Sequence, residues 1–271
     1  MKTFAEIVEN QTPDQWHAHL LCLGQNASAA FAGCETGPLL HVHLVRERHY
    51  LLGSGMGKKP LWFPDTSLLL AVIDRDEPGP DKWLERFRLT FNALPLVFIT
   101  LRAVAGLPGS AQGQTSETAP ASGSVSRWYF AENSRSPEAV MRFMTLAAQP
   151  LEFGKNTLMC VDFADYVCAL DGGGLIHVAK VTGRGCEQAE ETADAIFKQL
   201  QLSDASPERA PGAALIIEMA ARCWAGISLL GRISAYVKSR MRADASIAIS
   251  APLNCALADE TFNIFLAVRV A

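Results

Sequence analysis

Two carboxylates, Asp162 and Asp165, stand three residues apart in the stretch Cys160-Val161-Asp162-Phe163-Ala164-Asp165. If the chain is helical from Val161 onward, both side chains lie on one face of the first turn, where the helix N-terminus favours negative charge. Two exposed carboxylates at such a place can hold a water molecule or a cation when a substrate is brought to them. An acidic helix start with no catalytic role explains the same pattern, so the residues alone leave both interpretations open.

Cys160 stands at the same predicted helix start, a position that favours the reactive thiolate form of a cysteine. No histidine lies nearby in the sequence to act as its base, which makes nucleophilic thiol chemistry a weaker hypothesis. The seven cysteines are dispersed and form no Cys-x-x-Cys pair. We therefore expect reduced thiols in a cytoplasmic protein and no zinc site.

The composition excludes several classes of protein. The chain has 271 residues, of which 49% are apolar, enough for one large or two modest domains. Its net charge of −4 gives no electrostatic reason to expect binding to nucleic acid or to an anionic membrane. The first residues lack a secretory signal pattern, and no apolar run is long enough to predict a membrane span.

The first hundred residues alternate between apolar runs and turn signals, which predicts a parallel α/β sheet. We expect strands at 17–23, 39–45, 67–73 and 94–101, with helices at 27–32 and after Pro80. Two of the turns contain glycines, and one of these turns also contains two lysines. Backbone N–H groups and lysine side chains in such turns can bind a phosphate. An ordinary tight turn and a solvated surface loop also explain them. The candidate phosphate-binding residues are Gly24, Asn26, Gly53, Gly55, Lys58 and Lys59.

A loop and a helix in the middle of the sequence predict a boundary between two domains. Residues 106–126 are rich in Gly, Ser, Pro and Thr, which predicts a flexible loop. Ser136 and Pro137 form a good helix start, and the helix should run to about Ala148. We therefore expect one domain at 1–135, a central helix at 136–152 and a second domain at 153–271.

The second domain carries the clearest periodicity. Its pattern predicts strands at 175–181, 212–219, 245–249 and 262–270, helices at 186–202 and 227–241, and a turn at Gly183-Arg184-Gly185. The order is βαβαββ, which gives a small mixed sheet covered by two helices.

Together these features resemble the tubulin/FtsZ superfamily. Residues 157–165, TLMCVDFAD, resemble the synergy loop of FtsZ, which reads roughly Gly-Leu-Ile-Asn-Val-Asp-Phe-Ala-Asp. The acidic pair matches, whereas Cys160 replaces the loop asparagine and Thr157 the leading glycine. The turn at 183–185, followed by Ala189-Glu190-Glu191-Thr192-Ala193, is similar to a glycine-rich turn and helix in the second domain of that family. The resemblance is firm over 151–271 and rests on strand order over 17–101.

The main departure from the family lies at 74–81, where the resemblance places a phosphate loop with the signature Gly-Gly-Gly-Thr-Gly-Thr-Gly. This chain reads DRDEPGPD there. Two prolines remove amide donors, and the carboxylates would repel a triphosphate with only Arg75 to oppose them. We therefore expect a degenerate nucleotide-binding domain without ordinary GTP hydrolysis. The carboxylates concerned are Asp74, Asp76, Glu77 and Asp81.

The resemblance implies an α/β fold in which a Rossmann-like parallel sheet is joined by the central helix to a smaller mixed-sheet domain. It also implies that Asp162 and Asp165 act in trans, on the nucleotide face of a neighbouring subunit. We accordingly expect a bacterial, cytoplasmic assembly partner with no cofactor or metal. Through its acidic loop it would dock on an FtsZ-type protein, whose filaments it would cap or modulate, or on another copy of itself.

Two alternatives remain open at this point. In the first, the chain is a divergent filament-forming GTPase that uses GTP and magnesium. The six candidate phosphate-binding residues would then line the site, and Asp162 and Asp165 of a neighbouring copy would activate water. In the second, the chain is a two-domain α/β protein whose ligand is something else, and the acidic pair is an ordinary helix start.

Overall fold

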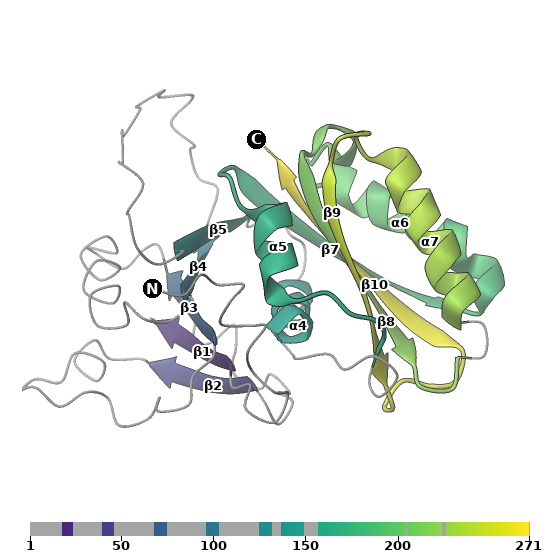
Figure 1. The fold of residues 1–271 in the computed structure, drawn as a ribbon, viewed down its shortest axis with the longest axis horizontal. Coiled ribbons are helices and arrows are strands. Elements are labelled where there is room, and N and C mark those ends of the chain that lie inside the picture. The colour runs from purple at the N-terminus through teal and green to yellow at the C-terminus, as the bar shows by residue number, and fades with distance from the viewer. Residues whose placement is uncertain are drawn as a thin grey trace, which may run out of the picture.

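The computed structural model describes residues 18–23, 40–45, 68–74, 96–102, 125–131, 137–148, 157–203, 205–223 and 226–270. Its described strands form one ten-stranded sheet in the order β2-β1-β3-β4-β5-β7-β10-β8-β9-β6. Figure 1 shows the first five strands on one side of the molecule and the strands from β7 onward on the other, with helices α4 and α5 between them. The expected helices at 27–32 and after Pro80 lie outside the described residues.

The N-terminal strands are parallel throughout, as their continuous apolar runs predict. Four of them match the predicted strands within two residues at either end. The fifth, β5, was not predicted, and its first two residues, Val125 and Ser126, correct the end of the expected loop at 106–126. Residues 106–124 lie outside the described residues. The strands are β1 (Ala18–Leu23), β2 (Leu40–Val45), β3 (Leu68–Asp74), β4 (Leu96–Arg102) and β5 (Val125–Ala131).

A helix is present where the central helix was expected, and it is α4, Pro137–Ala148. After it, the three-residue strand β6 (Thr157–Met159) pairs antiparallel with β9, and α5 (Phe163–Leu170) follows. Strand β6 was not predicted, because three residues between two helices give no periodicity to detect.

The C-terminal part follows the predicted βαβαββ order. Strand β10 is antiparallel to both β7 and β8, and β8 is parallel to β9. The elements are β7 (Leu175–Arg184), the 3₁₀ turn η3 (Cys186–Gln188), α6 (Ala189–Gln201), the 3₁₀ turn η4 (Pro207–Arg209), β8 (Gly212–Ala220), α7 (Gly226–Arg240), β9 (Ser246–Asn254) and β10 (Thr261–Val270).

The predicted turn at 183–185 was wrong in its position. Strand β7 continues through Gly183 and Arg184, and the chain turns only at Gly185, whose φ is 71°. Gly183 is needed for packing rather than for turning. A Cβ at this residue would lie 2.3 Å from the Phe262 ring and 2.5 Å from the Thr192 hydroxyl.

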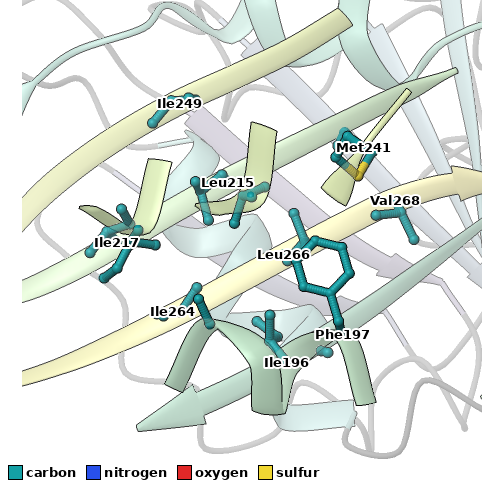
Figure 2. Packing of buried hydrophobic residues seen from close by; sticks show 14 of the residues in the cluster. Ile196, Phe197, Leu215, Ile217, Met241, Ile249, Ile264, Leu266 and Val268 are labelled. Carbon is teal, nitrogen blue, oxygen red and sulfur yellow. The ribbon is translucent and has the colours of Figure 1, made fainter. Parts of the chain in front are cut away.

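The C-terminal sheet is covered on both faces, which the sequence did not predict. Alternate residues of β8 and β10 point to opposite sides, as the pleat requires. Ala214, Ile216 and Phe265 pack in a cluster with α4 and α5. The other side packs against α6 and α7, and Figure 2 shows its aliphatic core, with Phe197 of α6 lying near Leu266. None of the described helices has the length and apolar character needed to cross a membrane.

Candidate functional site

Asp162 and Asp165 together form the N-terminal cap of α5. Asp162 is the cap residue itself, one position before the helix, and not part of the first turn as expected. Its Oδ1 accepts a 2.9 Å hydrogen bond from the Asp165 backbone N–H, and Asp165 Oδ2 accepts a 3.2 Å bond from the Asp162 N–H. This reciprocal capping box satisfies backbone donors that would otherwise lack a partner. The two carboxylates are therefore held beside each other.

The capping box uses one oxygen of each carboxylate. Asp162 Oδ2 and Asp165 Oδ1 have no hydrogen-bond partner among the described residues, and both aspartates are exposed, as is Cys160. Two outward oxygens beside the positive end of a helix can accept donors from a guanidinium, an ammonium group or a water molecule. Chemically, the arrangement is a fixed pair of acceptors on the surface.

Aromatic packing anchors the helix start from beneath. Phe163 is buried and stacks on Trp128 of β5 with ring centroids 5.6 Å apart. Tyr166, also buried, donates a 2.6 Å hydrogen bond to the Ser250 hydroxyl on β9. Burial, reinforced by the charge of Asp165, raises the pKa of Tyr166 well above its ordinary value, so the phenol stays neutral and keeps its proton for this bond. The helix that carries the acidic pair is thus fixed to β5 through Phe163 and to β9 through Tyr166.

Thr157 holds the other end of the loop, a role that the sequence analysis missed. Its side chain is fully buried, and Oγ1 lies 2.6 Å from the Met159 carbonyl and 2.8 Å from the Ala251 carbonyl on β9. The same hydroxyl accepts a 3.2 Å bond from the Met159 N–H. The pairing between β6 and β9 is irregular just ahead of the acidic pair, and the threonine hydroxyl supplies hydrogen bonds to backbone groups of both strands there. The one sequence signal for this role was that Thr157 stands where the FtsZ loop has a glycine.

Apolar groups are exposed beside this loop. Ile227, in the first turn of α7, is 80% exposed, and Met159 at the end of β6 is 40% exposed. The two elements adjoin, because a Cβ at Gly226 would lie 2.7 Å from Leu158 Cδ1. We call Met159, Cys160, Asp162 and Asp165, together with Ile227 at the start of α7, the docking end. It combines two exposed carboxylates with two exposed large apolar side chains.

A buried carboxylate ties α4 to the sheet near the docking end. Glu218 on β8 is 2% exposed and pairs with Arg142 of α4. Asn254 of β9 and Asn263 of β10 each donate a 2.8 Å hydrogen bond to it. The donors satisfy both oxygens of a charge that would otherwise be costly to bury. Sequence reasoning missed this group, because its partners lie 36 to 76 residues away along the chain.

The candidate phosphate-binding residues are not brought to this site by any described contact. Gly24, Asn26, Gly53, Gly55, Lys58 and Lys59 all lie outside the described residues. The backbone does place the ends of β1 and β3 side by side, with Leu23 opposite Ile73. Since β2 lies on the far side of β1, this is the point at which the strand order reverses, where open parallel sheets bind ligands. Here β3 ends in Asp74, a carboxylate.

The described parts are a parallel α/β sheet, a central helix and a mixed sheet covered on both faces, and together they define a tubulin/FtsZ-like fold. No protein-family model and no curated protein matches the sequence. Solved structures do match. A mutant FtsZ from M. jannaschii is 12% identical with a TM-score of 0.58, and the match covers 98% of this chain and 95% of that chain.

Other structures of the same class match in the same way. TubZ from Bacillus thuringiensis serovar israelensis, solved as GDP-form protofilaments, is 10% identical with a TM-score of 0.58 over 98% of this chain and 88% of that chain. CetZ1 from Haloferax volcanii, a GDP-bound monomer, is 11% identical with a TM-score of 0.53 over 94% of each chain. The similarity confirms the resemblance in fold.

Proposed function

We propose that this chain is an assembly protein that docks through the acidic end of its C-terminal part onto another subunit and does so without bound GTP. The observation that carries the proposal is the fixed pair of outward carboxylate oxygens on Asp162 and Asp165. A loop held by a capping box, a buried threonine and stacked aromatic rings keeps one shape before it meets a partner. Such pre-organisation lowers the entropic cost of association.

The charge and the exposed apolar groups of the docking end indicate what kind of partner surface would fit it. Asp162 and Asp165 each have an oxygen without a partner among the described residues, and Met159 and Ile227 are exposed on the two adjoining elements β6 and α7. The complementary surface would present N–H donors around an apolar patch. The nucleotide face of an FtsZ-type protein is one candidate, and a second copy of this chain is the other. Some structures with the same fold are described as dimers or protofilaments, which supports assembly as the general mode.

The sequence that follows β3 supports the proposed loss of nucleotide binding. Asp74 closes β3 beside the end of β1, and two prolines and three more carboxylates follow it in sequence within seven residues. A phosphate cradle depends on backbone N–H groups and on positive charge, and this stretch is poor in both. An assembly of this chain would therefore be independent of GTP, and the chain would act in the cytoplasm as a cap or modulator.

The docking test uses charge removal that preserves the cap. In the Asp162→Asn/Asp165→Asn double variant, the side-chain oxygens can still accept the two capping bonds, because Asn is as good an N-cap as Asp. Wild-type protein should self-associate in sedimentation velocity without nucleotide, or should lower the assembly or GTPase rate of an FtsZ-type protein from the same cell. The double variant should lose that effect. A wild-type chain that stays monomeric and alters neither rate would overturn the proposal.

The competing function is a divergent GTPase in which Asp162 and Asp165 activate water on a neighbouring copy. It is favoured by the matching acidic pair and by the TubZ structures of the same fold, which were solved in GDP and GTPγS forms. Steady-state GTP turnover that Asp162→Asn abolishes would move it to first place. Turnover that the variant leaves unchanged would be inconsistent with it.

A further inference from the structure

Arg269, next to the last residue of β10, is a cation without a partner in the part of the chain that the structure describes. Within the sheet it lies between Ile176 of β7 and Gly212 of β8. Its Nε is buried and makes no hydrogen bond, and neither terminal nitrogen, Nη1 or Nη2, bonds to a described residue. Burying a charged donor without a partner is costly, and such groups are rare in folded proteins. The guanidinium can therefore bind a group from outside the chain.

A run of three glycines, Gly172, Gly173 and Gly174, lies against this guanidinium between α5 and β7. Their φ angles are 113°, 83° and 87°, in the region that only glycine adopts readily. A Cβ at Gly172 would lie 2.0 Å from Arg269 Nη1, so a side chain at this position would displace the guanidinium. All three glycines are exposed. The loop therefore brings bare backbone to the charged end of Arg269.

The backbone N–H groups of this loop are a second set of donors without partners. The N–H of Asp171, just before the glycines, donates a 2.8 Å hydrogen bond to the Val167 carbonyl and ends α5. The N–H groups of Gly172, Gly173 and Gly174 donate to no described residue. With no side chain beside them, an anion can approach these amides closely. Guanidinium forks and glycine amides are the donors with which proteins hold phosphate and carboxylate groups.

Two neighbouring features act against an anion here. The Asp171 carboxylate is one residue away, and the negative end of α5 is close, since a Cβ at Gly212 would lie 1.8 Å from the Ala169 carbonyl oxygen. A cation at a helix C-terminus is itself favourable, which is the competing explanation of Arg269. That explanation predicts hydrogen bonds to the last carbonyls of α5, and Arg269 makes none within the described residues. It also leaves the glycine amides unexplained.

The geometry points to an oxyanion-binding site formed by the Arg269 guanidinium and the N–H groups of Gly172, Gly173 and Gly174, for a phosphate or a carboxylate group. The two terminal nitrogens of one guanidinium lie in a plane and can donate to two oxygens of the same group. The glycine amides beside them can donate to the same oxygens or to a third one. A phosphate uses all of these donors, whereas a carboxylate uses the guanidinium and one or two amides.

This oxyanion site is separate from the docking end. Arg269 pairs with Gly212, the first residue of β8, whereas Met219 near the end of β8 adjoins the docking end, since a Cβ at Gly226 would lie 3.8 Å from its sulfur and 2.7 Å from Leu158 Cδ1. At about 3.3 Å per residue, roughly 23 Å of strand separates the two levels. The inference therefore does not depend on the proposed function.

Inorganic phosphate is the probe for the first test, titrated into the full chain with chloride adjusted to hold the ionic strength constant. Glycine amide resonances, followed by ¹⁵N-resolved NMR, should shift at three positions and saturate at low millimolar phosphate. Arg269→Met should weaken this binding by about 10-fold or more, because it removes the charged fork. Shifts that never saturate, or equal affinity in the variant, would overturn the inference. The helix-end explanation predicts a less stable variant and no response to phosphate in either protein.

Two further variants keep the test decisive. Arg242→Met breaks a surface pair with Asp244, changes the net charge as Arg269→Met does, and should leave phosphate binding unaltered. Arg269→Lys keeps the charge without the fork and should bind with an intermediate affinity even if Arg269→Met fails to fold; wild-type affinity in it would contradict the two-oxygen contact. Sedimentation velocity of Arg269→Met then identifies the source of the anion. Weaker self-association than wild type would assign the carboxylate of another copy, and unchanged behaviour would assign free phosphate.

Discussion

The two faces of the C-terminal sheet are built in different ways. The face under α6 and α7 is closed mainly by aliphatic side chains, with Phe197 and Phe262 among them, and the polar contacts between these helices lie at its rim. The face under α4 and α5 is closed by aromatic rings together with buried polar ties, Glu218 with Arg142 and Tyr166 with Ser250. The acidic pair belongs to this second face.

The difference separates stability from positioning. Apolar contacts depend on area and hardly on direction, so the α6/α7 face can stabilise the sheet without fixing any surface group precisely. Buried hydrogen bonds and ion pairs require defined geometry, and their loss leaves an unsatisfied group. The α4/α5 face therefore fixes the helix that carries Asp162 and Asp165, at a cost in stability that the other face offsets.

Phe197→Ala should have the largest effect. Phe197 is 1% exposed, packs edge-to-face on Tyr236 at 6.2 Å and lies under the Arg240 guanidinium. Truncation opens a cavity and should lower the free energy of unfolding by about 3–5 kcal/mol. Urea denaturation followed by circular dichroism measures the change. Docking by the folded fraction should be unaltered; loss of docking would mean that the two faces do not divide their roles in this way.

Arg142→Met should cost almost as much, about 3 kcal/mol, because it leaves the Glu218 charge buried with amide donors alone. The Arg142→Met/Glu218→Gln double variant should recover most of that loss, since the buried charge is gone. Lys198→Met, which breaks a surface pair with Asp194, is the matched control and should stay within about 0.5 kcal/mol. If the Arg142 variant behaved like the Lys198 variant in denaturant titrations, polar ties would not hold this face.

Asp162→Ala should lower stability by about 1 kcal/mol, because it removes the acceptor for the Asp165 N–H at the start of α5. Asp162→Asn keeps that acceptor and should remain within about 0.5 kcal/mol of wild type. Thermal unfolding of both variants distinguishes the capping role from the charge. Equal losses in the two would show that charge alone stabilises the helix start.

The smallest effect concerns pH and the rim of the α6/α7 face. Hydrogen bonds from Lys198, then from Tyr236, with a further contribution from Arg240, lower the pKa of Asp194 to about 2, against an ordinary value of 3.8. Because the folded-state pKa is the lower one, the stabilisation is present above about pH 4 and is lost as pH falls towards 2. Asp194 is 30% exposed, so the gain should stay below about 1 kcal/mol. Asp194→Asn should lack this component when unfolding is followed from pH 5 to pH 2; an unchanged pH profile would contradict the assignment.

Sequence periodicity predicted the elements that have one apolar face. Helices α4, α6 and α7 repeat apolar residues at clear intervals, so their bounds were predicted to within three residues. Strand β9, predicted at 245–249, instead continues to Asn254. Strand β5 was missed because its start follows a stretch whose composition predicts a loop. The turn at Gly183 was misplaced because glycine serves there for close packing with Phe262, which no local pattern reveals.

The sequence singled out the acidic pair, whose role in trans stays a prediction, but it did not reveal the residues that support this pair. Asp162 and Asp165 stand close enough in sequence for local rules to relate them, although those rules left the capping box unrecognised. Thr157, Glu218 and Ser250 act through partners on distant strands, so their roles follow only from the register of the sheet. The expected phosphate-binding residues stay a prediction.

Calorimetric titration of the purified chain with GTP and with GDP, both in the presence of magnesium, tests the central claim most directly. No heat of binding is expected at high micromolar nucleotide if the proposal holds, because the sequence from Asp74 to Asp81 contains two prolines and four carboxylates. Saturable binding of either nucleotide would contradict it, and the acidic pair would then be assigned to hydrolysis in trans.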